Sequence, residues 1–190
     1  MRRWLPILGL VVIGGVLGAA AIVASTFVYR ATATDAFCTS CHSMAGIGAD
    51  PHYQQSAHRG NAAGVQAHCA DCHLPAGNWF AETYAHASSG IRDGIAELTG
   101  SARDPAVWAA RLPVLADRVR EAMRRDDSAS CRTCHDASLI HPASEAGRAA
   151  HAMLTQRQVT CIDCHFNIVH APIAPSASFL HGSGLGRVRP

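Results

Sequence analysis

The sequence predicts a mostly α-helical, loop-rich domain joined to one membrane-spanning helix. Three observations lead to this fold class: a long uncharged apolar run near the N-terminus, four copies of a short cysteine–histidine motif, and few bulky side chains. Only 6% of the 190 residues are aromatic. Because a chain with so few large side chains builds a thin core by itself, we expect bound groups to fill the interior.

The membrane anchor is predicted at residues 4–29, after a cytoplasmic N-terminus of residues 1–3. Arg2 and Arg3 precede the run WLPILGLVVIGGVLGAAAIVASTFVY, which ends at Arg30. As a helix this run spans roughly 39 Å, enough to cross a hydrocarbon core of about 30 Å. A cleaved signal peptide, the alternative, has an apolar region of only about 7–15 residues. The arginine pair orients the N-terminus toward the cytoplasm, which places the remaining chain on the outer side of the membrane.

All eight cysteines belong to copies of the pattern C-x-x-C-H. The copies are CTSCH (38–42), CADCH (69–73), CRTCH (131–135) and CIDCH (161–165). This pattern is the attachment signature of c-type haem, in which two thiols bond to the porphyrin and the histidine binds the iron. We therefore predict four haems at residues 30–175. The attachment residues are Cys38, Cys41, Cys69, Cys72, Cys131, Cys134, Cys161 and Cys164, and the motif ligands are His42, His73, His135 and His165.

Three other interpretations of the cysteines explain less of the pattern. A zinc site uses C-x-x-C pairs but does not require a histidine after each pair. A thioredoxin-like redox site needs one pair within a βαβ context, which the sequence does not suggest. A disulfide framework leaves the four histidines unexplained.

An internal repeat indicates where further iron ligands lie. The spacing from His42 to His58 is 16 residues, and the spacing from His135 to His151 is also 16. This predicts two repeated dihaem halves, residues 35–100 and 126–172. Iron that only transfers electrons usually has two axial ligands, so His58 and His151 are candidates for the second positions. His170, five residues after His165, is a third candidate.

Met44 distinguishes the first motif from the others. It lies two residues after His42, and the matching position of the second half is Ala137. Met44 is either a core residue beside the porphyrin or an iron ligand whose thioether shifts the potential of the first haem. From the residues alone, His42 and Met44 stay alternatives for that iron, and a site bound on one side only could accept a substrate.

Two longer helices and a tail complete the expected organisation. Residues 77–100 show helical periodicity, with one apolar stripe, one polar stripe, and aromatic residues suited to the membrane interface. A helix over 105–125, begun by Asp104 and Pro105 and kinked at Pro113, is expected to link the halves and to bury one stripe. The stripe comprises Trp108, Leu112, Leu115, Val119 and Ala122. Residues 176–190 are predicted to form an irregular tail.

Four stretches of the chain resemble the NapC/NirT family of membrane-anchored tetrahaem cytochromes c. They are CTSCHSM, SAHRGNAAGVQAHCADCHLP, DDSASCRTCH and TCIDCHFNIVH, which with the anchor span almost the whole length. The resemblance implies oxidation of membrane quinol and transfer of electrons to a periplasmic reductase, commonly one for nitrate or nitrite. It also implies Met44 as the first iron's ligand and Asp93 over the other face of that haem, near the quinol. Family members often have a lysine in this region; this chain has none, and His86 lies close to the position.

The expected protein is thus a tetrahaem quinol dehydrogenase of nitrate or nitrite respiration or denitrification, with Asp93 and His86 accepting protons from quinol. The alternative is a haem-based reductase acting directly on a small nitrogen oxyanion such as nitrite. A third hypothesis, a non-haem metal-binding or structural membrane protein, leaves the repeated histidines unexplained.

With a formal net charge of +2 and no arginine-rich run, nucleic acid is not an expected partner. The sequence leaves the quinol type, the reductase and the oligomeric state open.

Overall fold

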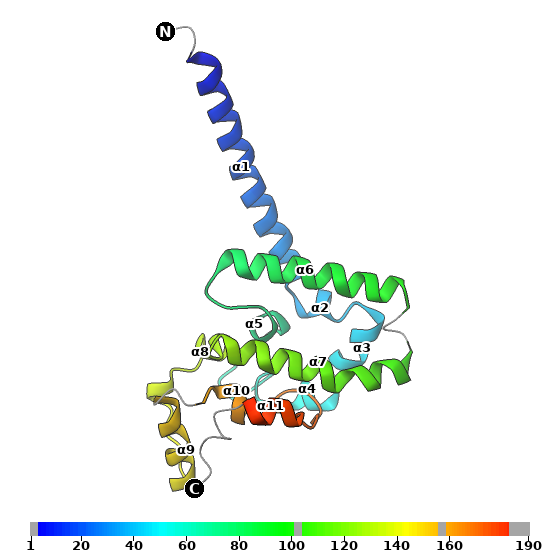
Figure 1. Ribbon diagram of the computed structural model, residues 1–190, viewed down its shortest axis with the longest axis vertical. Coiled ribbons are helices and arrows are strands. Elements are labelled where there is room, and N and C mark those ends of the chain that lie inside the picture. Colours follow the sequence, from blue (N-terminus) through cyan, green and yellow to red (C-terminus); the bar gives the residue numbers. More distant parts are fainter. Residues whose placement is uncertain (1–3, 101–103, 156–158, 183–190) are drawn as a thin grey trace.

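The computed structural model describes residues 4–100, 104–155 and 159–182, and within these ranges it contains helices and loops but no strands. A long N-terminal helix projects from a domain of shorter helices (Figure 1). The helices are α1 (Leu5–Thr32), α2 (Asp35–Cys38), α3 (His42–Gly48), α4 (Pro51–Gln55), α5 (Cys69–His73), α6 (Trp79–Leu98), α7 (Pro105–Arg125), α8 (Ala129–Arg132), the 3-10 helix η1 (Ala137–Leu139), α9 (Glu145–Thr155), α10 (Cys161–Cys164) and α11 (Ala177–Gly182).

The first helix, α1, stands almost free of the rest of the molecule. It has 28 residues, a mean hydropathy of 2.6 in its most apolar window, and no buried residue. Its length and composition suit a membrane span, and it is the one such helix within the described residues. It continues a few residues beyond the run predicted from sequence, to Thr32, so its last turn reaches past a hydrocarbon core of about 30 Å.

The short helices of the domain carry the four C-x-x-C-H motifs. The second and fourth motifs lie in α5 and α10, the third lies at the end of α8, and the first lies across the turn from α2 to α3. Contacts join α2 to α5 and α5 to α8, so the first three motif regions follow one another in chain order, and α10 packs against α7. Two long helices, α6 and α7, run alongside them (Figure 1).

The helix α7 begins at Pro105 with Asp104 as its N-cap, over the range expected for the linking helix, and it continues through Pro113. Its burial differs from the prediction. Four residues of the expected stripe are only half-buried and Ala122 is exposed, whereas Arg120 is 4% exposed. Arg120 can be buried because its guanidinium donates to the Asp117 carboxylate at 2.7 Å and to the Ile173 carbonyl oxygen at 2.6 Å. The apolar periodicity of the sequence does not reveal such partners.

The prediction of an irregular tail at 176–190 was wrong for its first part. Ala177–Gly182 form α11, which contacts α7 and carries the fully buried Phe179. The Arg124 guanidinium lies 3.8 Å from the centroid of the Phe179 ring. It also donates a hydrogen bond to the backbone carbonyl oxygen of Phe179 at 3.0 Å. Six residues are too few to show a period, so this helix depends on tertiary contacts. Residues 183–190 lie outside the described ranges.

Candidate haem-binding centres and their membrane end

Each half of the domain holds its two motifs in place with the same two kinds of hydrogen bond, referred to below as devices. In the first, the side-chain acceptor lies three residues before the first cysteine of the half. Asp35 accepts the backbone N–H of Cys69 at 2.8 Å, and Ser128 accepts the backbone N–H of Ile162 at 3.2 Å. A free N–H at the start of the second motif helix is thereby satisfied by a residue next to the first motif, which ties the two motifs of each half together.

The second device is the aspartate inside the motifs CADCH and CIDCH. Asp71 and Asp163 occupy the third position of their helices and accept the backbone N–H of the N-cap residue, at 2.8 Å in both cases. The N-cap side chains of His68 and Thr160 complete a capping box in each helix. The other two motifs, CTSCH and CRTCH, lack this aspartate, so the repeat extends beyond the cysteines and histidines.

The Asp35 carboxylate is also the centre of a polar cluster. Besides Cys69 it meets His68 Nδ1 at 3.1 Å and accepts the Tyr53 hydroxyl at 3.2 Å. Burial by itself would raise the pKa of Asp35, but the hydrogen bonds from Cys69, His68 and Tyr53 outweigh it and lower the pKa to about 2. Asp35 is therefore a fixed negative charge between the first two motifs.

Three pairs of histidine rings face one another across the domain. The ring centroids of His58 and His135 are 6.0 Å apart, those of His73 and His170 are 6.1 Å apart, and those of His151 and His165 are also 6.1 Å apart. Each pair joins one motif histidine to one of the candidates picked out from the sequence. Burial lowers the pKa of His73, and His170 lowers it further, which favours the neutral imidazole that binds a metal.

The separation of the paired rings fits a haem iron. A metal–imidazole nitrogen bond is about 2 Å long, so two imidazoles on opposite sides of one metal have ring centroids roughly 6 Å apart. The observed pairs meet this requirement, and each has a C-x-x-C pair immediately before the motif histidine. The side chains present therefore fit three haems with an imidazole on either side.

The first motif differs from the other three. His42 and Met44 both lie in the first turn of α3; His42 is exposed and Met44 is half-buried. Residues two apart on a helix point in different directions, so only one of the two can reach a given iron. The start of α3 is fastened to α6, because Glu97 accepts the Ser43 backbone N–H at 2.9 Å and also its hydroxyl.

The polar stripe of α6 meets the end of the membrane helix. Glu82 accepts the hydroxyl of Tyr29, and Thr32 Oγ1 lies 2.7 Å from His86 Nε2. The ring centroids of Tyr29 and His86 are 5.2 Å apart. The same stripe reaches the first motif at Glu97, about three turns after His86. It therefore runs from the membrane end of the domain to α3.

The structure places Asp93 on α6 as an exposed residue, one turn before Glu97. His86 and Asp93 thus share the helix that links α1 to the first motif, but only His86 contacts α1. Sequence analysis predicted a polar stripe on this helix without giving Glu82 or Glu97 a role, and it did not single out Asp35 or Ser128. The position three residues before the first cysteine of each half was the signal that could have identified the last two.

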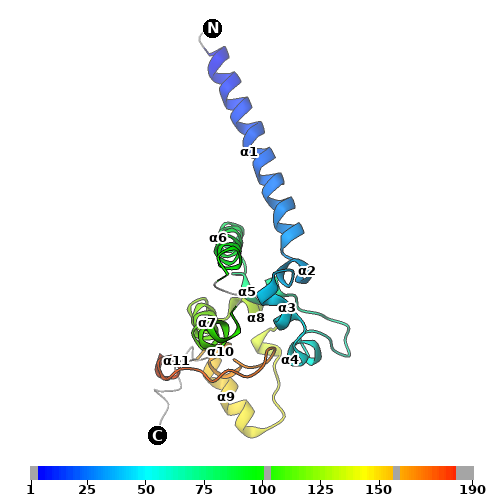
Figure 2. The ribbon, with the colours of Figure 1, turned by 90° about the vertical axis from the view of Figure 1, so that its right-hand side faces the viewer.

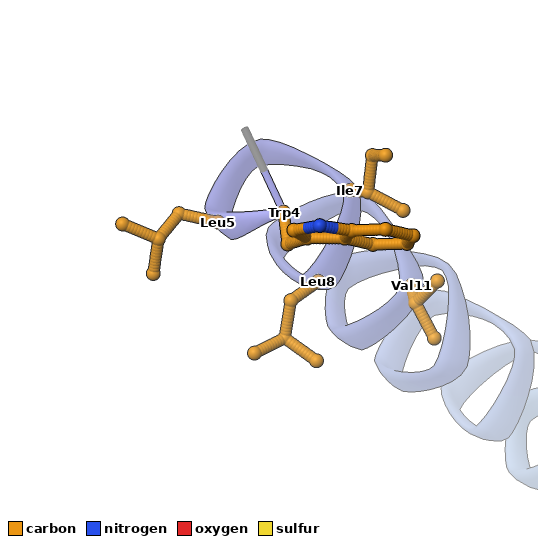
Figure 3. Close-up of a pocket in the computed structure, with 5 residues that line it drawn as sticks. All are labelled: Trp4, Leu5, Ile7, Leu8 and Val11. Carbon is orange, nitrogen blue, oxygen red and sulfur yellow. The ribbon is translucent and has the colours of Figure 1, made fainter. Parts of the chain in front are cut away.

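A hollow of about 370 Å³ lies at the far end of α1, lined by Trp4, Leu5, Ile7, Leu8 and Val11 (Figure 3). All five side chains belong to one helix, and none of them is titratable. The hollow is part of the apolar surface that a membrane would cover, and it is not a candidate catalytic site.

Comparison with known proteins agrees with the motif pattern. The model of the NapC/NirT cytochrome c family, N-terminal region, matches residues 1–175. The cytochrome c-type protein TorC of Escherichia coli is 36% identical over 171 residues, covering 88% of this chain and 43% of TorC. The denitrification system component NirT of Stutzerimonas stutzeri is 31% identical, covering 85% of this chain and 80% of NirT. The tetraheme c-type cytochrome CymA of Shewanella oneidensis is 32% identical, covering 86% and 90%. No solved structure matches the chain.

An apolar anchor followed by a helical domain with four haem motifs in series defines a membrane-bound multihaem cytochrome c. More specifically, the chain belongs to the NapC/NirT cytochrome c family. It carries four covalently attached c-type haems and transfers electrons. It is held in the inner membrane by α1, and its haem domain lies in the periplasm. The chain spans less than half the length of TorC, so TorC's activity as a whole protein is not assigned to it.

Proposed function

We propose that this protein oxidises membrane quinol at the periplasmic end of α1 and passes the electrons along its four haems to a periplasmic reductase of the nitrate or nitrite type. One observation carries the proposal: a stripe bearing Glu82 and His86 contacts the end of the membrane span and continues to the first haem motif. Quinol is confined to the bilayer, so a group that takes its protons has to lie at this level. A direct nitrite reductase would instead need a polar, water-accessible site for an anion.

The histidine pairs support an assignment of iron ligands. On this assignment His170 serves the haem of His73, His58 serves the haem of His135, and His151 serves the haem of His165. The two halves then exchange ligands, since His58 comes from the first half and His170 from the second. Met44 or His42 is left for the first haem, which distinguishes the haem nearest α6 from the rest.

His86 is the residue best suited to take a proton from quinol. The Thr32 hydroxyl donates to the Val28 carbonyl oxygen at 2.7 Å, so Thr32 Oγ1 accepts from the N–H of His86 Nε2. This fixes the neutral tautomer of His86 and leaves the lone pair on Nδ1 able to accept a proton. Asp93, two turns further along the stripe, is exposed and would take protons onward to the periplasm.

The haems supply one-electron acceptance in series when bound. The residues of the chain hold the quinol end in place and remove its protons. Quinol gives up two electrons and two protons when it is oxidised, so proton transfer has to keep pace with electron transfer. An imidazole with a free lone pair can accept a proton and release it again, so His86 can act in each turnover.

The test is quinol-dependent haem reduction by the full-length protein in nanodiscs, with ubiquinol and menaquinol analogues. His86→Gln should lower the rate about 100-fold, the lower end of the usual contribution of a positioned base. Asp93→Asn should lower it less. The matched control is His52→Gln, an exposed histidine of α4 away from α1. No reduction by either quinol in the unaltered protein, together with rapid nitrite turnover from an artificial donor, would favour the direct reductase instead.

A further inference from the structure

The helix α6 has the reverse of the orientation expected for an amphipathic helix in a water-soluble domain. Its polar residues Glu82, His86 and Glu97 contact other parts of the protein. Its apolar stripe is exposed: Phe80 is 77% exposed, Tyr84 75%, Ile91 64%, Ile95 56% and Leu98 84%. A helix on a water-facing surface has its apolar stripe toward the protein and its charged face toward solvent. An apolar stripe of this length facing water would be unfavourable.

The position of α6 indicates what covers this stripe. In Figure 1 α6 runs across the lower end of α1, and in Figure 2 it is seen almost end-on, so α6 crosses the end of the span rather than running alongside it. Their contacts lie at Tyr29 and Thr32, the last turn of the membrane span. A helix that crosses the end of the span at that level lies at the depth of the membrane surface. In Figure 2 the helices α3, α5 and α7 lie below α6, so its upper side is uncovered.

The composition of α6 suits a position in the interface better than a second crossing. Twenty residues form a helix about 30 Å long, but the polar stripe excludes it from the hydrocarbon core. Trp79, Phe80 and Tyr84 lie in its first two turns, and such aromatic residues are favoured at the level of the lipid headgroups. Helices with this pattern bury their apolar face about 5–10 Å into the boundary between headgroups and acyl chains.

We propose that α6 is a second membrane contact, a helix embedded in the periplasmic leaflet with Phe80, Tyr84, Ile91, Ile95 and Leu98 among the acyl chains. The stripe belongs to a helix that contacts the last turn of the membrane span, which makes lipid its occupant rather than a second copy of the chain. The domain is then held at two places, and its orientation relative to the bilayer is fixed. The proposal rests on the geometry of α1 and α6 and does not require quinol as the electron donor.

The test uses introduced cysteines in the full-length holoprotein, whose own eight cysteines are occupied by haem. Leu98→Cys and Ile91→Cys place a thiol on the stripe. Leu139→Cys is the matched control, because Leu139 is 71% exposed and belongs to η1 in the other half of the domain. Each variant is placed in nanodiscs of phosphatidylethanolamine and phosphatidylglycerol with one protein chain per disc, so that a second copy cannot cover the stripe. The haem spectrum verifies that each variant has assembled.

Labelling is measured with a charged, membrane-impermeant maleimide and, separately, with N-ethylmaleimide. The ratio of the two rates removes differences in the reactivity of the individual thiols. We expect this ratio to be at least about tenfold lower for Leu98→Cys and Ile91→Cys than for Leu139→Cys, because the charged reagent does not enter the leaflet. Equal ratios at the three positions would overturn the proposal. Since no quinol is present, that result would leave the proposed quinol oxidation untouched.

Discussion

The first half of the haem domain and the second differ in how much protein surrounds their motifs. Among the described residues, the first half buries one large apolar side chain, Tyr53. Residues 105–182 bury Val159, Ile162 and Phe179, together with Arg120 and Asp163. The local devices are nevertheless the same in the two halves: an acceptor three residues before the first cysteine, and an aspartate in the second motif.

The difference shows that haem motifs can be positioned by hydrogen bonds at helix ends, whatever the size of the surrounding core. The two halves differ in which other helices support them. The second half packs against α7, whose arginines hold Asp163 and the segment leading to α11. The first half is attached through α6 to the membrane helix. We therefore expect the second half to depend on buried ionic contacts and the first half on partly buried polar contacts and the membrane.

The largest expected effect is that of Arg124→Ala, which tests the dependence of the second half on α7. Arg124 Nε lies 2.6 Å from Asp163 Oδ1, and the Asp163 side chain is only 2% exposed. Removing one partner of such a pair leaves an unpaired buried charge, which costs about 3–5 kcal/mol. The free energy of unfolding, measured by denaturant titration followed by circular dichroism, should fall by this amount.

Arg132→Ala is the matched control for this substitution. Arg132 also pairs with an aspartate, Asp127, at 3.1 Å, but the two side chains are 32% and 65% exposed. Exposed pairs contribute about 0–1 kcal/mol. Equal losses for the two variants would mean that the contact of Arg124 with Asp163 gives the second half no special stability.

Acid should weaken the first half through Asp35. The folded pKa of this carboxyl group is about 2, below the 3.8 of a free aspartate side chain. A group whose pKa is lowered by folding stabilises the protein above its unfolded pKa and loses that contribution as the pH falls toward its folded pKa. Lowering the pH from about 5 to 2 should therefore remove about 2 kcal/mol.

The measurement is thermal unfolding across this pH range, with Asp35→Asn as the comparison. The variant should be less stable than the unaltered protein at pH 5 and should show a shallower loss of stability below pH 4, because it has no carboxylate to protonate. Parallel pH profiles for the two proteins would contradict the role given to Asp35.

The sequence predicted the parts of this molecule that repeat or have a regular period. The anchor follows from an uninterrupted apolar run, the haems follow from four motifs, and His58 and His151 follow from equal spacing. Each of these signals lies within the sequence itself. The sequence did not reveal the burial of Arg120 or Phe179, because both depend on partners more than 40 residues away. Nor did it show which histidines face one another, since that pairing crosses between the halves.

Ser128→Ala tests whether the acceptor in the second half works as the one in the first half does. Ser128 is fully buried, and its hydroxyl oxygen accepts the N–H of Ile162 near the start of α10. Replacing a helix-capping serine by alanine costs typically about 1 kcal/mol. Denaturant titration should show this loss for Ser128→Ala but a smaller one for Ser138→Ala, whose exposed hydroxyl bonds only within its own turn. A Ser128→Ala variant as stable as the unaltered protein would restrict the shared device to Asp35.

The smallest effect is expected for Thr32→Val, which breaks one of the two polar contacts between the first half and α1. Thr32 Oγ1 lies 2.7 Å from His86 Nε2 in a partly exposed position, so its loss should cost only about 0.5 kcal/mol. The control is Thr26→Val, because the hydroxyl of Thr26 bonds only to the Ile22 carbonyl oxygen within α1.

The valine side chain of Thr32→Val cannot accept the His86 N–H, so the tautomer of His86 would no longer be fixed. The rate of quinol-dependent haem reduction should therefore fall for Thr32→Val while its thermal stability hardly changes. If the rates of Thr32→Val and Thr26→Val both equal that of the unaltered protein, Thr32 joins α6 to the membrane helix without orienting His86.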